Sequence, residues 1–157
     1  MSMSLHDLGP VKILVPLSTF IDKQNLLRAL QALAILKNPV VVLFRVIEVP
    51  RRTTPLDPSL WRDDIKNAET FLAESASWLE KEGYKVERKV VTARNTAEGI
   101  ITEANGGGYT VVLMMKRRIM SGWVRIFHRS ISEEVIRHAN TLVLTFLAEQ
   151  ELGEKKA

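Results

Sequence analysis

A basic connector, which joins an apolar segment to a capped helix, contains the residues best placed to do chemistry. Its cationic side chains are Lys116, Arg117, Arg118, Arg125 and Arg129. Ser-Ile-Ser-Glu at 130–133 follows with the pattern of a capping box, in which the Ser130 hydroxyl accepts from an early helical N–H. A strand, a loop and a helix N-terminus in this order commonly bind anions in α/β proteins. The residue types therefore predict either an anion site built from side chains or a solvated basic loop without a ligand.

Catalysis and metal binding have little support in the sequence. His128 lies close to Ser130, but there is no Gly-x-Ser-x-Gly turn around this serine, which is already assigned to the helix cap. His6, His128 and His138 are too scattered for a metal site, and the chain contains no cysteine. We therefore expect no enzymatic activity, no bound metal and no required cofactor.

The composition is typical of one globular domain. The chain has 157 residues, 46% of them hydrophobic and 25% charged. No segment resembles a signal peptide, and no apolar run approaches the roughly 20 residues that cross a bilayer. The formal net charge is +4, and the only dense run of basic residues is 116–118, which contains no interleaved aromatic residue. We expect a cytoplasmic protein with no nucleic-acid partner and no direct membrane insertion.

Strands and helices alternate along the chain. Apolar runs predict strands at 12–17, 40–49, 85–91, 110–115 and 141–146. Helical spacing predicts helices at 23–36, 58–82, 96–104 and 130–138. We expect Asp57 and Thr96 as N-caps and Gly83 as a helix stop. The pattern predicts a single α/β domain at 11–147, doubly wound and Rossmann-like, with a five-stranded parallel sheet, helices on both faces, and flexible tails at 1–10 and 148–157.

Four segments resemble the universal stress protein family, whose members are small α/β domains and typically homodimers. Lys-Ile-Leu-Val-Pro at 12–16 is similar to the family's opening strand. Residues 41–49, followed by Pro50, resemble its second strand and the next turn. Residues 130–139 and 141–144 resemble its last helix and closing strand. The resemblance covers nearly the whole chain and implies the strand order 3-2-1-4-5.

The phosphate-binding motif of the ATP-binding members is replaced in this sequence. Those members carry Gly-x-x-Gly, nine residues, and then Gly-Ser or Gly-Thr before the last helix. Counting back from Ser130, the three glycines fall on Arg129, Ile119 and Lys116. The aspartate that contacts the nucleotide after the opening strand falls on Ser18. Side chains at the former glycines block close approach of the backbone to a phosphate, so the chain resembles the branch that does not bind ATP.

The resemblance implies a non-catalytic regulatory or stress-response domain that works through protein contacts. The alternative is a sensor of an anion or a nucleotide, ATP or AMP, that uses the basic loop 116–130 in place of glycines. Its candidate ligand-binding residues are Ser18, Val46, Lys116, Arg118, Gly122, Arg129 and Ser130.

Partners are expected at the last strand, because an unpaired apolar strand at a sheet edge promotes association. In the family this strand pairs with its symmetry mate, which implies a homodimer formed through Thr141, Val143, Leu144 and Thr145. The segment 46–51 is also similar to universal stress domains fused to amino-acid permeases. A third alternative is therefore a regulatory module of an amino-acid transporter, whose partner would be that membrane transporter.

Overall fold

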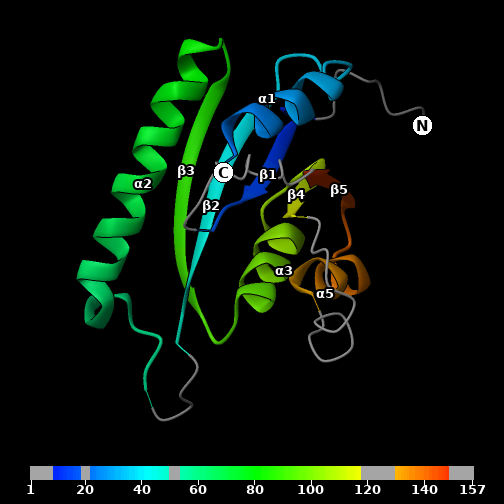
Figure 1. Ribbon diagram of the computed structural model, residues 1–157. Helices are drawn as coiled ribbons and strands as arrows, with labels where there is room; N and C mark the ends of the chain where they lie inside the picture. The colour runs from blue at the N-terminus through cyan, green and yellow to red at the C-terminus, as the bar shows by residue number, and fades with distance from the viewer. Residues whose placement is uncertain (1–8, 19–21, 50–53, 118–129, 149–157) are drawn as a thin grey trace, which may run out of the picture.

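The protein forms a five-stranded sheet covered by helices on both faces (Figure 1). The structure is a computed structural model that describes residues 9–18, 22–49, 54–117 and 130–148. The strands are β1 (Lys12–Pro16), β2 (Val40–Glu48), β3 (Lys85–Ala93), β4 (Val111–Arg117) and β5 (Leu142–Ala148). The helices are α1 (Lys23–Ala32), the 3-10 turn η1 (Pro58–Trp61), α2 (Arg62–Lys81), α3 (Thr96–Gly106) and α5 (Ile131–His138).

The sheet has the predicted topology. Its order is β3-β2-β1-β4-β5, and all four neighbouring pairs are parallel. Side chains at alternate positions of each strand belong to two separate cores. One core joins Ile13, Val15, Val41 and Leu43 to α1 and α2, and the other joins Leu14, Val42 and Phe44 to α3 and α5. The central strands are buried on both faces, as near-continuous apolar runs predict.

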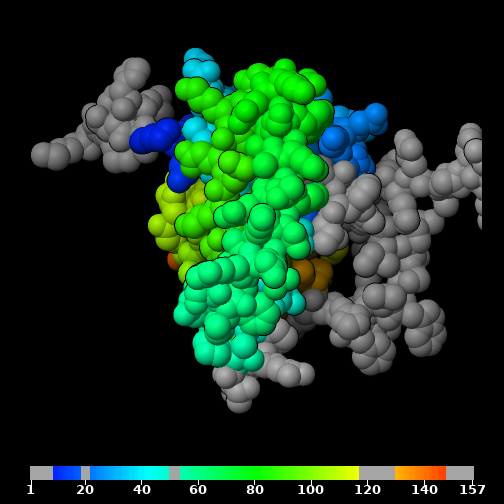
Figure 2. Space-filling model, turned by 90° about the vertical axis from the view of Figure 1, so that its left-hand side faces the viewer, coloured from blue at the N-terminus to red at the C-terminus, as the bar shows by residue number. Residues whose placement is uncertain are grey.

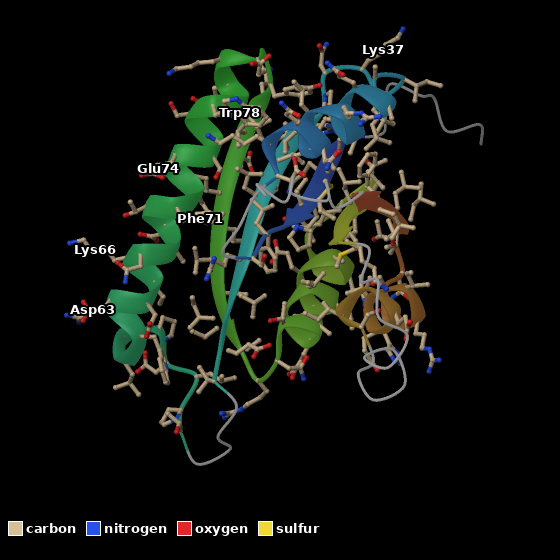
Figure 3. The ribbon with its side chains drawn as sticks, in the orientation of Figure 1. Lys37, Asp63, Lys66, Phe71, Glu74 and Trp78 are labelled. Atoms are coloured by element: carbon tan, nitrogen blue, oxygen red, sulfur yellow. The ribbon has the colours of Figure 1, made fainter. Side chains whose placement is uncertain are left out.

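Helix α2 is amphipathic and covers one side of the sheet. Its buried residues are Ala68, Leu72, Ser75, Ala76 and Leu79. Phe71 and Trp78 point toward the interior, whereas Asp63, Lys66 and Glu74 point away from it (Figure 3). When the left-hand side of Figure 1 faces the viewer, α2 runs along much of the height of the molecule (Figure 2). In the described ranges, no helix combines the length and the apolar character that a membrane crossing requires.

Several predicted boundaries were wrong, each for a local reason. Helix α1 ends at Ala32 rather than at 36, because the chain turns at 33–38 and reaches positive φ at Asn38. Asp57 caps η1, a 3-10 turn, before α2 begins. The N-cap of α3 is Asn95, whose side chain accepts from Glu98 N, and Thr96 is the first helical residue. Strand β3 extends to Ala93 because it pairs with β2 up to Glu48.

The turn between α5 and β5 is fastened to α3 by Asn105. The Asn105 amide donates to His138 O at 3.2 Å, and its oxygen accepts from Asn140 N at 2.7 Å. The Thr141 hydroxyl donates to Ala104 O at 3.2 Å. The prediction that Thr141 begins the last strand was therefore wrong: Thr141 belongs to this turn, and β5 begins at Leu142.

We expect Asn105→Ala to lower the free energy of unfolding by about 1–2 kcal/mol, since two backbone groups lose their partner. Chemical denaturation of this variant and of Asn105→Asp measures the effect. The aspartate keeps the acceptor for Asn140 N and is expected to lose less stability. Equal stability of the alanine variant and the wild type would contradict the assignment.

Candidate functional site

The carboxyl ends of β1 and β4 form the point where the winding of the sheet reverses, which is where α/β proteins of this type bind ligands. The two strands pair only at Ile13 with Val111 and at Leu14 with Val112, whereas β1 and β2 pair along five positions. Beyond Leu14, β1 leads toward α1 and β4 leads toward α5, on opposite faces. Lys116 and Ser130 lie on the α5 side of this point.

Lys116 and Ser130 are the two predicted site residues that the structure brings into direct contact. Lys116 Nζ donates to Ser130 Oγ at 3.3 Å. The same hydroxyl accepts from Glu133 N at 3.2 Å, as the capping pattern predicted, and lies 3.0 Å from Ser132 Oγ. An ammonium group is therefore held at the N-terminal end of α5, the positive end of its dipole. An anion at this position would be attracted by both the cation and the helix.

The N-terminus of α5 carries three further polar residues. Ser132 is buried, and its hydroxyl is close enough to Ser130 to share a hydrogen bond. Glu133 and Glu134 lie in the first turn, where they complement the dipole. Glu134 also lies 3.8 Å from His138 in the last turn, an ion pair when the histidine is protonated.

The end of β1 does not supply a free carboxylate. Ser18 is exposed and follows Leu17, whose N–H still donates to Phe44 O at 2.8 Å. The next acidic residue, Asp22, is the N-cap of α1. Both of its oxygens bind Asn25, one through the backbone N–H at 3.1 Å and the other through the side-chain amide at 2.6 Å. Asp22 therefore does not replace the missing aspartate.

Val46 lies in a packed contact between β2 and α3. A Cβ added to Gly99 would lie 2.7 Å from Val46 Cγ2 and 2.9 Å from Cγ1, so the helix rests directly on this side chain. Val46 is half-buried and belongs to the core on the α3 side. Val46 therefore supports α3 by packing, whereas Lys116 and Ser130 are polar residues in direct contact with each other.

Glu48, which the sequence did not indicate, closes the N-terminus of α3. Its Oε1 accepts from Thr96 N at 2.8 Å and from Thr96 Oγ1 at 2.6 Å. A carboxylate of the chain thus takes the place that an exogenous anion would occupy at this helix end. The signal is long-range, because 48 residues separate the two partners, and no local motif predicts it.

Three of the predicted ligand-binding residues, Arg118, Gly122 and Arg129, lie outside the described residues, as does His128. The strand predicted to form the homodimer, β5, lies within the described residues. Strand β5 pairs with β4 and forms one end of the sheet. Val143 and Leu144 are half-buried, Thr145 is exposed, and the large side chains of Leu142 and Leu147 are 62% and 50% exposed.

The comparisons with known proteins agree with this fold. The model of the universal stress protein family matches residues 11–146. The hypothetical protein MJ0577, the subject of a structure-based assignment of biochemical function, is similar in structure with a TM-score of 0.68 and 24% identity, over 89% of this chain and 97% of that one. None of the curated proteins compared matches the chain.

Two other solved structures were described with a nucleotide. A universal stress protein from Archaeoglobus fulgidus in complex with dAMP is 20% identical with a TM-score of 0.57, over 86% of this chain and 96% of that one. A universal stress protein in complex with cAMP is 16% identical with a TM-score of 0.62, over 88% and 97% of the two chains. At these identities the likeness establishes the shared fold.

Proposed function

Because the chain belongs to the universal stress protein family, we propose that it is a non-catalytic regulatory domain that acts as a homodimer through protein contacts and does not bind ATP. The observation that carries the proposal is the position of Lys116. This residue stands where the ATP-binding members are expected to have the first glycine of their motif. Its ammonium group donates a hydrogen bond to the hydroxyl of Ser130. Ser130 is the one phosphate-binding position of the motif that the chain retains.

The remaining neighbourhood supports the same proposal. Ser18 replaces the aspartate expected to contact the nucleotide, and the nearest carboxylate, Asp22, is engaged with Asn25. The N-terminus of α3 is closed by Glu48. A triphosphate would have to displace Lys116 from Ser130 and would find no neighbouring glycine at 116 that allows close backbone approach.

The second candidate function, a sensor of an anion or a nucleotide, is favoured by the same lysine. A cation, a hydroxyl and the positive end of α5 converge at one place, and each of them stabilises negative charge. Relatives of the same fold were solved with dAMP and cAMP. This candidate requires that binding depend on Lys116, so Lys116→Met should abolish any affinity for nucleotide or phosphate.

Substitution of the exposed apolar side chains of β5 tests whether the homodimer forms through this strand. We expect the wild type to sediment as a dimer at micromolar concentration, and the double variant Leu142→Glu, Leu147→Glu to sediment as a monomer, because it places charges on both sides of a buried interface. Ile35→Glu is the matched control, since Ile35 is 86% exposed and lies in the turn after α1 rather than on β5. A monomeric wild type, or equal dissociation of the control, would contradict the proposal.

A further inference from the structure

Within the described ranges, the outer edge of β3 presents backbone groups that lack a partner strand. Strand β3 is the terminal strand of the sheet and pairs with β2 on one side. Ala93 O accepts from Val49 N at 2.8 Å and therefore points toward β2. Since backbone groups alternate in direction along a strand, the N–H and C=O groups of Val86, Arg88 and Val90 point outward. Such a row of unpaired groups is a template for another strand.

A cavity and two exposed cations accompany this edge. The cavity has a volume of about 250 Å³ and is lined by Glu69 of α2 and by Arg88, Lys89 and Val90. Strand β3 carries three cations, Lys85, Arg88 and Lys89, and one anion, Glu87, and Glu69 of α2 adds a second carboxylate beside it. Lys89 is paired with Glu103 at 2.8 Å. Lys85 and Arg88 are exposed, and in the described part of the chain neither has an ion-pair partner.

We propose that the β3 edge is a docking site for an extended acidic segment of a partner protein, which adds to the sheet as an additional strand. The outward backbone groups at Val86, Arg88 and Val90 supply main-chain hydrogen bonds, as in other cases of strand addition. Acidic side chains at alternate positions share one face of the added strand and pair with Arg88, and the cavity beside Val90 accepts a side chain of the segment. Lys85 lies on the other face of β3 and adds to the positive charge near the segment. The exposed cations repel basic strands, so the edge selects its partner by charge.

Strand addition at β3 rests on the proposed function, in which the domain works through protein contacts, and it specifies the class of protein partner. The two can fail separately. Titration with a nucleotide reports on the end of β4 and on α5, whereas strand addition occurs at the opposite end of the sheet. A nucleotide-binding protein would therefore still be able to bind a peptide at β3, and the reverse also holds.

Amide hydrogen exchange measured by NMR on the full chain tests the proposal. The probe is a short blocked peptide that alternates valine and glutamate, and its comparison is the same peptide with lysine in place of glutamate. We expect the acidic peptide to slow exchange at Val86, Arg88 and Val90 by at least about tenfold, since exchange then requires local opening. The inward amides of Glu87 and Lys89 should change little.

Charge variants complete the test. Arg88→Glu should weaken the acidic peptide by at least about tenfold, because like charges then face each other. Lys66→Glu makes the same charge change on the outward side of α2 (Figure 3) and should leave affinity unchanged. The proposal is overturned if the amides of Val86, Arg88 and Val90 stay unprotected, or if the two peptides or the two variants behave alike. It is also overturned if protection rises with protein concentration alone, because the added strand would then come from a second copy of the chain.

Discussion

Gly99→Ala is expected to destabilise the protein by about 1–3 kcal/mol, although alanine is a better helix former than glycine by about 1 kcal/mol. The added Cβ would lie 2.7 Å from Val46 Cγ2, closer than a Cβ packs in proteins, and 3.2 Å from Ala93 Cβ, which is a tight contact. Val46 is β-branched and in a strand, so it has little freedom to rotate away. Helix α3 would have to move away from the sheet. Thermal or chemical unfolding measures the loss.

Two matched variants separate this clash from a general effect of the helix. Gly106→Ala changes another glycine of α3, around which an added Cβ meets nothing within 4 Å, and should be neutral or stabilising. In a Val46→Ala background, Gly99→Ala should lose its cost, because the clashing methyl groups are gone. A Gly99→Ala variant as stable as Gly106→Ala would show that α3 does not rest on Val46.

Tyr109 is expected to make the protein sensitive to alkaline pH. Burial, followed by the hydrogen bond to Glu103 and by the charges of Glu103 and Glu87, raises the pKa of Tyr109 above its ordinary value of 10. The phenol donates to Glu103 Oε1 at 2.7 Å, and Glu103 also binds Lys89. Because the folded pKa is the higher one, the contribution of Tyr109 is complete below pH 10 and is lost progressively as pH rises above it.

Tyr109→Phe tests this prediction with two readouts. At neutral pH the variant should lose about 1.5–3 kcal/mol of stability, the usual range for a hydrogen bond to a charged group. Its free energy of unfolding should fall less steeply above pH 10 than that of the wild type. Tyr84→Phe controls for the loss of a tyrosine as such. Identical pH profiles of Tyr109→Phe and the wild type would contradict the assignment.

The fold was predictable because the determining signals are local. Apolar runs and helical spacing located the strands and helices, and the resemblance implied the observed strand order. The errors fell at ends that depend on partners distant in sequence. Thr141 looked like part of a strand, but its hydroxyl binds Ala104 and the turn is held by Asn105. Strand β3 continues to Ala93 because β2 offers it a partner there.

The candidate site was predictable only in part. Ser130 was identified because a capping box is a short pattern, and Lys116 because it is counted from that pattern. Their hydrogen bond joins the end of a strand to the start of a helix 14 residues later. Glu48 and Ser132 carried no local signal, since an acidic residue at the end of a strand and a serine within a helix are both common.

Isothermal titration of the nucleotide-stripped protein with ATP, with and without magnesium, tests the central claim most directly. The claim is that Lys116 on Ser130, together with the loss of the glycines and of the aspartate, has removed the nucleotide site. The expected result is no heat of binding at high protein concentration, for the wild type and for Lys116→Met alike. Micromolar binding of ATP that disappears in Lys116→Met would contradict the claim and establish the anion-sensing alternative.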